Sequence, residues 1–254
     1  MAVAAELGVR RVEQIMGMPI VVDVRDDVDD GVLDDLFDWF RAVDRTFSTY
    51  KPDSEISRIA RGELDPNGAS ADVREILDRC ERLREETHGY FDARAGGTLD
   101  PSGLVKGWSV DRGARILDEA GLRNYAINAG GDIRLSGGAR PDPVWRVGIQ
   151  HPRIRDRVAA VVEGTDLAVA TSGAYARGEH VLDPHARRPP AGVLSVTITG
   201  PDLATADAYA TAAYAMDGEL APQWTAFLPA GYEAMTILAD DRVLFTRGFP
   251  RAAG

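Results

Sequence analysis

The sequence contains only one cysteine, Cys80, and lacks an apolar run long enough to cross a membrane as a helix. A single cysteine excludes an intramolecular disulfide and argues against a zinc site built on thiolates. Cys80 lies in the helical pattern "EILDRCERL" beside apolar residues, which favours a small buried side chain over a nucleophile.

Basic residues are fewer than acidic ones: 29 Lys and Arg stand against 40 Asp and Glu, which gives a formal net charge of -11. An acidic surface repels a phosphate backbone, so we expect no nucleic-acid partner. A small phosphate ligand stays open, because a local basic group or a cation can hold one.

The N-terminal "MAVAAELGVRRVEQ" has no basic segment followed by a long apolar stretch. We therefore expect no signal peptide, no membrane anchor and a cytoplasmic location. The 254 residues, 44% hydrophobic and 27% charged, are typical of a globular protein with a substantial core. We expect one domain over residues 1–254, with an N-terminal tail over about 1–14.

Apolar periodicity predicts an α+β fold, with mixed, largely antiparallel sheets packed with helices. Helices are expected at 29–47, at 70–89 between the cap Ser70 and the stop Gly89, at about 107–121, and in the alanine-rich segment 205–215. Segment 48–58 is expected to be a polar loop. Strands are expected at 18–26, on both sides of the glycine pair in "INAGGDI", in "WRVGIQHP", "RVAAVVEG", "LAVATSG" and "VLSVTITGP", and in a C-terminal hairpin that turns at Asp240-Asp241.

The alanine-rich segment "TADAYATAAYA" carries its single carboxylate, Asp207, and a threonine hydroxyl, Thr211, four positions apart. Positions i and i+4 lie on the same face of a helix, so both side chains reach one point. The pair is either a buried structural contact or a pair of oxygen ligands for Mg²⁺.

Other polar positions each allow two interpretations. Lys106 follows a glycine-containing loop near the expected start of a helix, where phosphate oxygens bind well, but it also suits a solvated surface turn. Asp100 could accept hydrogen bonds from a ligand. Tyr50 could stack on a planar ring or be a half-buried loop residue. The glycine pair lacks the dinucleotide fingerprint and favours a tight turn.

The histidines lack the spacing of a helical zinc site, and His180 is expected to orient a loop or ligand without a catalytic role. The segment "TSGAY" is not a nucleophile elbow. Asp92 follows Tyr90 and Phe91 at the expected end of a helix and has no evident capping role there.

Taken in order, these segments resemble the ApbE-like flavin transferases, the FAD:protein FMN transferases. The resemblance extends from about residue 15 to 247. It is carried by "MG" at 16–17, "STYKPDSEISR" at 48–58, "GYFD" at 89–92, "D..G..KG...D" at 100–111, "NAGGDI" at 128–133, "WRVGIQHP" at 145–152, "ATSGAY" at 170–175, "HVLDP" at 180–184 and "ADAYAT" at 206–211.

The resemblance implies a tandem T-fold-like architecture and an enzyme that uses Mg²⁺ and FAD. Such an enzyme cleaves the FAD pyrophosphate, transfers FMN to a Thr or Ser of a target flavoprotein and releases AMP. It also implies catalytic roles for Asp207 and Lys106, and metal ligation by Asp207, Thr211 and the backbone carbonyl of Gly103. The FAD contacts that it implies are Met16, Tyr50, Tyr90, Phe91, Asp92, Asp100, Lys106 and Leu182.

The sequence departs from the family pattern in a short connection between residues 89 and 106, in Pro101 within "DPSG", and in Ala210, where relatives often have Asp or Ser. These departures favour two alternatives: an FAD pyrophosphatase that yields FMN and AMP, or a flavin-binding protein without catalysis. The Asp207 and Thr211 pair and Lys106 favour catalysis.

Overall fold

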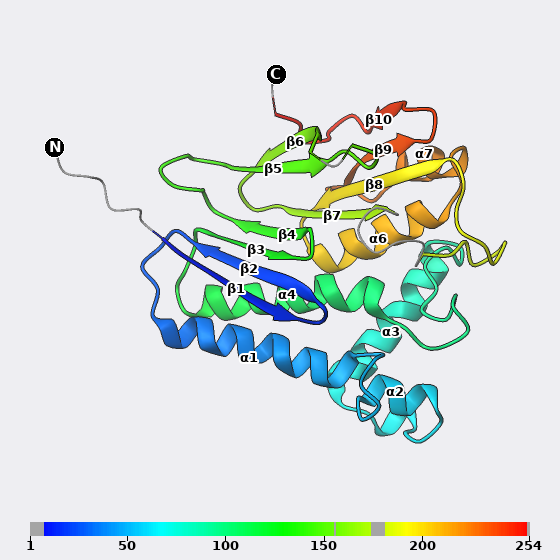
Figure 1. The fold of residues 1–254 in the computed structure, drawn as a ribbon, viewed down its shortest axis with the longest axis horizontal. Coiled ribbons are helices and arrows are strands. Elements are labelled where there is room, and N and C mark those ends of the chain that lie inside the picture. Colours follow the sequence, from blue (N-terminus) through cyan, green and yellow to red (C-terminus); the bar gives the residue numbers. More distant parts are fainter. Residues whose placement is uncertain (1–7, 155, 174–180, 253–254) are drawn as a thin grey trace.

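The structure, a computed structural model, describes residues 8–154, 156–173 and 181–252. Its centre is an eight-stranded sheet in which every neighbouring pair is antiparallel (Figure 1). The strands, in spatial order, are β1 (Val9–Ile15), β2 (Met18–Val24), β3 (Tyr125–Ala129), β4 (Asp132–Ser136), β7 (Ala168–Gly173), β8 (Val193–Gly200), β9 (Glu233–Leu238) and β10 (Val243–Phe245).

The chain builds this sheet in two halves of similar design, each with two strands, intervening helices and two further strands. The first half places α1 (Asp30–Phe47), α2 (Glu55–Ala60), a 3-10 turn (Pro66–Gly68), α3 (Ala71–Glu86) and α4 (Ser102–Glu119) between β2 and β3. The second places α6 (Leu203–Ala215) and α7 (Leu220–Thr225) between β8 and β9. This order confirms the expected α+β class and fits a tandem T-fold-like plan.

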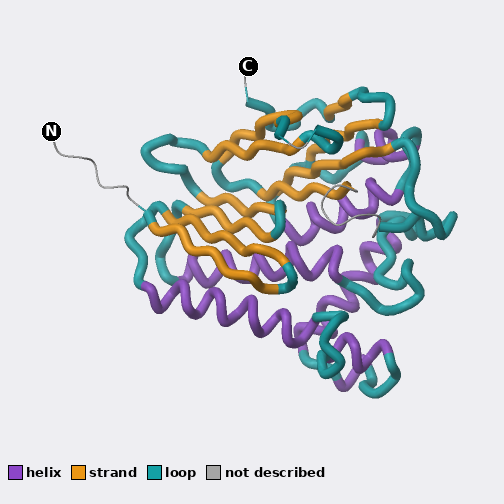
Figure 2. Tube along the Cα trace, in the orientation of Figure 1, coloured by secondary structure: helices purple, strands orange, loops and turns teal. Residues whose placement is uncertain are grey.

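The helices cover one face of the sheet, as Figure 2 shows, and the main core lies between them and the strands. In α1, which Asp29 caps by accepting a hydrogen bond from Gly31 N, the apolar stripe Leu33, Leu36, Phe37, Phe40 and Val43 is buried. In α6 the alanines are buried all round the helix. Small side chains therefore let α6 lie close to both the sheet and α4.

The opposite face of the sheet carries a smaller core under the hairpin of β5 (Trp145–Gln150) and β6 (Val158–Gly164). Alternating residues separate the two cores along β7: Val169 belongs to the smaller core, and its neighbours Ala168 and Ala170 belong to the main one.

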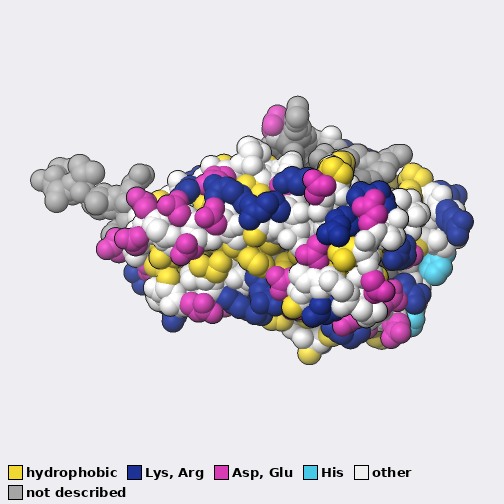
Figure 3. Space-filling model, turned by 90° about the horizontal axis from the view of Figure 1, so that it is seen from below, with side chains coloured by type: hydrophobic (Ala, Val, Ile, Leu, Met, Phe, Trp, Pro, Cys, Tyr) yellow, Lys and Arg dark blue, Asp and Glu magenta, His cyan; other side chains and the backbone are white. Residues whose placement is uncertain are grey.

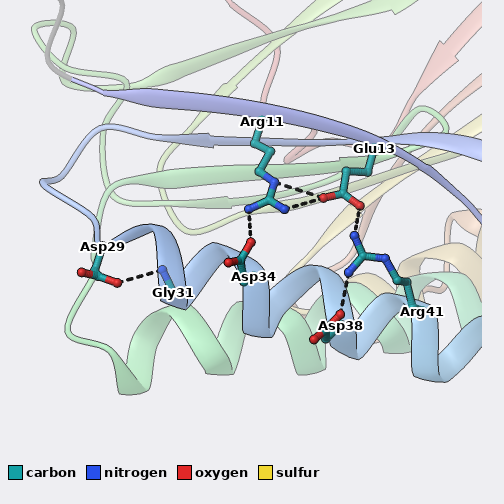
Figure 4. Close-up of polar contacts among 7 residues, drawn as sticks. All are labelled: Arg11, Glu13, Asp29, Gly31, Asp34, Asp38 and Arg41. Carbon is teal, nitrogen blue, oxygen red and sulfur yellow. Dashed lines mark hydrogen bonds and ion pairs between the residues drawn. The ribbon is translucent and has the colours of Figure 1, made fainter.

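A chain of ion pairs joins the edge strand β1 to α1 (Figure 4). The Arg11 guanidinium lies 2.7 Å from a Glu13 oxygen and 2.6 Å from an Asp34 oxygen, and Arg41 links Glu13 to Asp38. These side chains are partly exposed, so solvent screens them and they contribute little to stability. They orient β1 against α1 along an edge that charged residues protect from pairing with other chains.

The main differences from the sequence prediction are at element ends. The expected tail over 1–14 is too long, because Val9–Ile15 pairs with β2 along its length; its charged residues, typical of an edge strand, hide the strand pattern. Within the expected loop 48–58, Ser54 accepts a hydrogen bond from Ser57 N and starts α2. The helix expected from about 107 begins at Ser102, so Lys106 lies inside it.

Several other expected elements are confirmed. Ser70 caps α3, Gly89 has a positive φ just beyond it, and the C-terminal hairpin turns at Asp240-Asp241.

No helix within the described ranges is long and apolar enough to cross a membrane. Seen from below, acidic and basic side chains are interspersed over the surface (Figure 3).

Cys80 is buried in the main core, as expected, and burial raises the pKa of its thiol to about 12. We therefore expect native protein at pH 8 to react with a thiol reagent at least about 100-fold more slowly than protein unfolded in guanidinium. The reagent releases a coloured thiolate as it reacts with Cys80, and the absorbance of that thiolate measures both rates. Equal rates would contradict the buried position of this thiol.

Candidate active site

Helices α4 and α6 make an antiparallel contact that is the most extensive between two helices in the described part of the chain. Matching stripes of residues, each spaced by four positions, face one another along it. The stripes are Gly103, Gly107 and Asp111 on α4, and Thr211, Asp207 and Leu203 on α6. A Cβ placed on Gly107 would lie 2.4 Å from the Leu203 carbonyl oxygen, and one on Gly103 would lie 3.3 Å from Thr211 Oγ1. Glycine is therefore needed at the crossing.

Asp111 fixes the start of α6 on α4. Its two carboxylate oxygens accept hydrogen bonds from the first N–H groups of α6, at 3.0 Å from Leu203 and 2.8 Å from Ala204. Asp202 adds a side-chain cap through Thr205 N at 2.9 Å. Burial raises the pKa of Asp111, while these backbone donors oppose the shift. The carboxylate thus sets the register that places Asp207 opposite Gly107.

Asp207 is buried at the centre of this contact. Its Oδ2 accepts a hydrogen bond from Gly107 N at 3.1 Å, and its Oδ1 lies 3.4 Å from Lys106 Nζ. Burial raises the pKa of Asp207 well above its ordinary range; the Lys106 charge opposes the shift and the Asp132 charge adds to it. Lys106, expected near a helix start, instead lies inside α4 with its ammonium between two carboxylates.

The second carboxylate is Asp132, the first residue of β4. Its Oδ2 lies 2.5 Å from Lys106 Nζ, and its Oδ1 accepts a hydrogen bond from Thr171 N on β7 at 3.0 Å. The β4–β7 ladder pairs Ile133 with Val169 and Arg134 with Ala168, and Leu135 and Leu167 exchange backbone hydrogen bonds at one end of it. The bond from Thr171 N to Asp132 extends the junction between the two halves at the other end.

The Oγ1 atom of Thr211, one turn after Asp207, lies 3.4 Å from Ser172 Oγ on β7. In a regular α-helix the N–H of Gly107 bonds the carbonyl of Gly103, and here that N–H also serves Asp207. A carbonyl oxygen has two lone pairs, so the Gly103 carbonyl can accept from Gly107 N and still bind another partner. A buried carboxylate, a hydroxyl and a carbonyl form a set of hard oxygen ligands, which fits Mg²⁺.

Within the described ranges, no three His, Cys, Asp or Glu side chains gather in a way that could hold a metal. A cation here would complete its coordination with water or phosphate oxygens, as Mg²⁺ usually does.

Two other predicted residues are Phe91, which lies beside this cluster, and Tyr90, which contacts a neighbouring segment. The buried Phe91 ring lies 3.4 Å from the position that a Cβ on Gly103 would occupy. Tyr90 meets His185 edge to face, with ring centroids 4.6 Å apart, and His185 Nε2 lies 3.0 Å from the His88 carbonyl oxygen. The segment that contains the half-buried Leu182 thus lies against the segment after α3.

The remaining predicted residues lie in the surrounding turns. Met16 forms the β1–β2 turn with a positive φ, and Asp92 and Asp100 accept hydrogen bonds from the nearby N–H groups of Arg94 and Ser102. The Tyr50 side chain is 95% exposed, so the structure does not pack it against the cluster.

The sequence interpretation did not assign roles to Asp132, Thr171, Ser172 or Asp111. The position of Asp111, one helical turn after Gly107, could have predicted that it lies on the same helix face as Gly107. Asp132 had no such signal beyond its place after the glycine pair, because its partners come from α4 and β7. His180 lies outside the described residues.

A separate cavity of about 440 Å³ lies on the opposite face of the sheet, beside the β5–β6 hairpin. Its lining includes Gly131, Gln150, His151, Arg153 and Thr171. It does not contain the Asp207 cluster. We place the candidate site at the cluster because buried charge and oxygen ligands converge there.

Comparison with known proteins finds a matching family model and several relatives of this chain. The model of the ApbE family matches residues 16–97 and 93–236. An FAD:protein FMN transferase from Vibrio cholerae is 34% identical over 170 residues, which cover 63% of this chain and 51% of the relative. One from Rhodobacter capsulatus is 34% identical over 164 residues, which cover 61% and 30%. The chain thus spans about half or less of the length of these relatives.

Solved structures share the fold. The flavin transferase ApbE from Vibrio cholerae superposes with a TM-score of 0.82 at 24% identity, covering 95% of this chain and 98% of that one. The ApbE protein from Thermotoga maritima gives 0.84 at 22% identity, with coverages of 96% and 100%.

We expect Gly107→Ala to separate α4 from α6, because its Cβ would overlap the Leu203 backbone. The overlap should cost about 1–3 kcal/mol, more than the gain of about 1 kcal/mol from alanine in a helix. Denaturant unfolding measures the change. Gly96→Ala, in an exposed loop with no atom within 4 Å of the added Cβ, is the control. Equal stability of the two variants would contradict the close contact.

Proposed function

The chain belongs to the ApbE family, and on that premise we propose that it is a Mg²⁺-dependent FAD:protein FMN transferase. In the proposed reaction, a Thr or Ser hydroxyl of a target flavoprotein attacks the phosphorus of the FMN moiety of FAD. The bond from that phosphorus to the bridging oxygen breaks, the bridging oxygen leaves with AMP, and FMN stays on the acceptor as a phosphoester.

The observation that carries the proposal is the buried Asp207, held opposite Gly103 and Gly107 with Thr211 one turn away. Asp207 shares the one Lys106 ammonium with Asp132, so the two buried carboxylates keep one negative charge that needs a further cation or proton. The oxygen groups around Asp207 suit a cation that binds diphosphates. The curated relatives, named as FAD:protein FMN transferases, support FAD as the diphosphate.

In this proposal Asp207, Thr211 and the Gly103 carbonyl hold Mg²⁺. When bound, the ion supplies charge that stabilises the pyrophosphate oxygens as the bond breaks. Lys106, whose side chain is 19% exposed, presents its ammonium to the same oxygens. Phe91 closes the apolar side of the site beside Gly103.

The residues around the cluster bind the rest of FAD. Tyr50, almost fully exposed, is available to stack on a planar ring, and Met16, Tyr90, Asp92, Asp100 and Leu182 contribute from the surrounding turns. In this proposal the proton of the acceptor hydroxyl passes to Asp207, the carboxylate beside the proposed cation.

We expect the wild type to release AMP from FAD in the presence of Mg²⁺ and an acceptor, and Asp207→Asn to reduce the rate at least about 100-fold through loss of the charge that holds the ion. Asparagine keeps an acceptor for Gly107 N, so the fold should survive. Chromatographic detection of AMP measures the rate, and Asp35→Asn, an exposed carboxylate on α1, is the matched control. Undiminished Mg²⁺-dependent release by Asp207→Asn would overturn the assignment.

A second experiment separates transfer from hydrolysis. With a candidate flavoprotein as acceptor, we expect AMP and flavin-labelled acceptor in equal amounts. Labelling should vanish when the acceptor Thr or Ser is replaced by valine, because valine has no hydroxyl to form the phosphoester. In-gel flavin fluorescence and mass spectrometry follow the label. AMP with free FMN and no label would instead identify a pyrophosphatase, and FAD binding without AMP a flavin carrier.

A further inference from the structure

The Lys106 ammonium lies between two buried carboxylates that come from different halves of the fold. It is 2.5 Å from Asp132 Oδ2 and 3.4 Å from Asp207 Oδ1. The two carboxylate side chains are only 2% and 3% exposed, so solvent screens their charges weakly. The position of the Lys106 ammonium therefore determines how strongly the Asp207 carboxylate can attract a second cation.

Lys106 and a divalent cation compete for Asp207. Both are positive, and Asp207 Oδ2 already accepts a hydrogen bond from Gly107 N, so the ammonium faces the remaining oxygen, Oδ1. An ammonium drawn fully onto Oδ1 would block that oxygen and repel an incoming cation. The site needs a means of keeping Lys106 nearby without letting it occupy Asp207.

Asp132 is placed to do this. Its Oδ1 is held by Thr171 N at 3.0 Å, which fixes the carboxylate and aims Oδ2 at Lys106. The contact from Lys106 to Asp132 is 0.9 Å shorter than the contact to Asp207, the difference between 3.4 and 2.5 Å. At this burial the closer charge pair is the stronger one.

We propose that Asp132 is a positioning residue that holds the Lys106 ammonium off Asp207 and thereby leaves Asp207 open to the divalent cation. The inference rests on the proposed cation site at Asp207. It assigns to Asp132 no contact with the cation and no part in bond breaking. Its effect on the cation passes through Lys106.

Mg²⁺ affinity without FAD tests this inference apart from catalysis. Isothermal titration calorimetry measures it for the wild type, Asp132→Asn, Lys106→Met and the double variant, with Asp35→Asn as the control of equal charge change. Asparagine at position 132 still accepts the Thr171 N–H, so the β4–β7 junction is retained. Thermal melts confirm that each variant folds before its Mg²⁺ affinity is compared, and Asp132→Asn, which leaves Lys106 paired with Asp207, is the variant best suited to fold.

We expect Asp132→Asn to weaken Mg²⁺ binding at least about tenfold when Lys106 is present, because the ammonium then moves onto Asp207. In the Lys106→Met background the same substitution should weaken binding far less. Direct attraction between Asp132 and the cation is common to both backgrounds, so the ratio of the two effects isolates the part that acts through Lys106.

Each other outcome is decisive. Equal weakening in both backgrounds would make Asp132 a ligand or a simple source of charge and overturn the inference. No weakening in either background would overturn it as well. If the wild type binds no Mg²⁺, the proposed cation site fails and the inference fails with it, whereas Mg²⁺ binding by the wild type without the expected ratio overturns the inference alone.

Discussion

The close antiparallel contact of α4 with α6 is the constraint on which the rest of the structure depends. Two glycines and a run of alanines let the helix backbones approach, and Asp111 fixes their register through the first N–H groups of α6. Only at this separation does Gly107 N reach the Asp207 carboxylate. The same approach puts Lys106 beside Asp207, so a packing requirement and a chemical requirement are met by the same small residues.

The sequence contains local information that predicts part of this site. The spacing of Asp207 and Thr211 predicted a shared helix face, and both residues do lie on α6. The ends of elements were harder to predict. Charged residues masked β1, and the loop pattern before Lys106 hid the first turn of α4, where Asp100 accepts a hydrogen bond from Ser102 N. Asp132 could not be assigned, because its partners are distant in the sequence and meet only after the sheet has formed.

Two departures from the family pattern have clear structural settings. The short connection after α3 is compact: Phe91 and Leu99 are buried, and Phe91 packs beside Gly103. Ala210 is fully buried on α6, so a carboxylate there would need a partner of its own. The α4–α6 contact is built from small residues in this chain, and the fold it shares with the Thermotoga maritima protein persists at 22% identity.

The junction between β4 and β7 has a consequence for how the protein matures. Lys106, Gly103 and Asp132 belong to the first half of the chain, and Asp207, Thr211 and Thr171 belong to the second. Neither half contains all the residues of the cluster, so a nascent or partly folded chain cannot assemble it. Lys106 and Asp132 therefore meet Asp207 only when the two halves have docked, so the assembled cluster reports that the junction has formed.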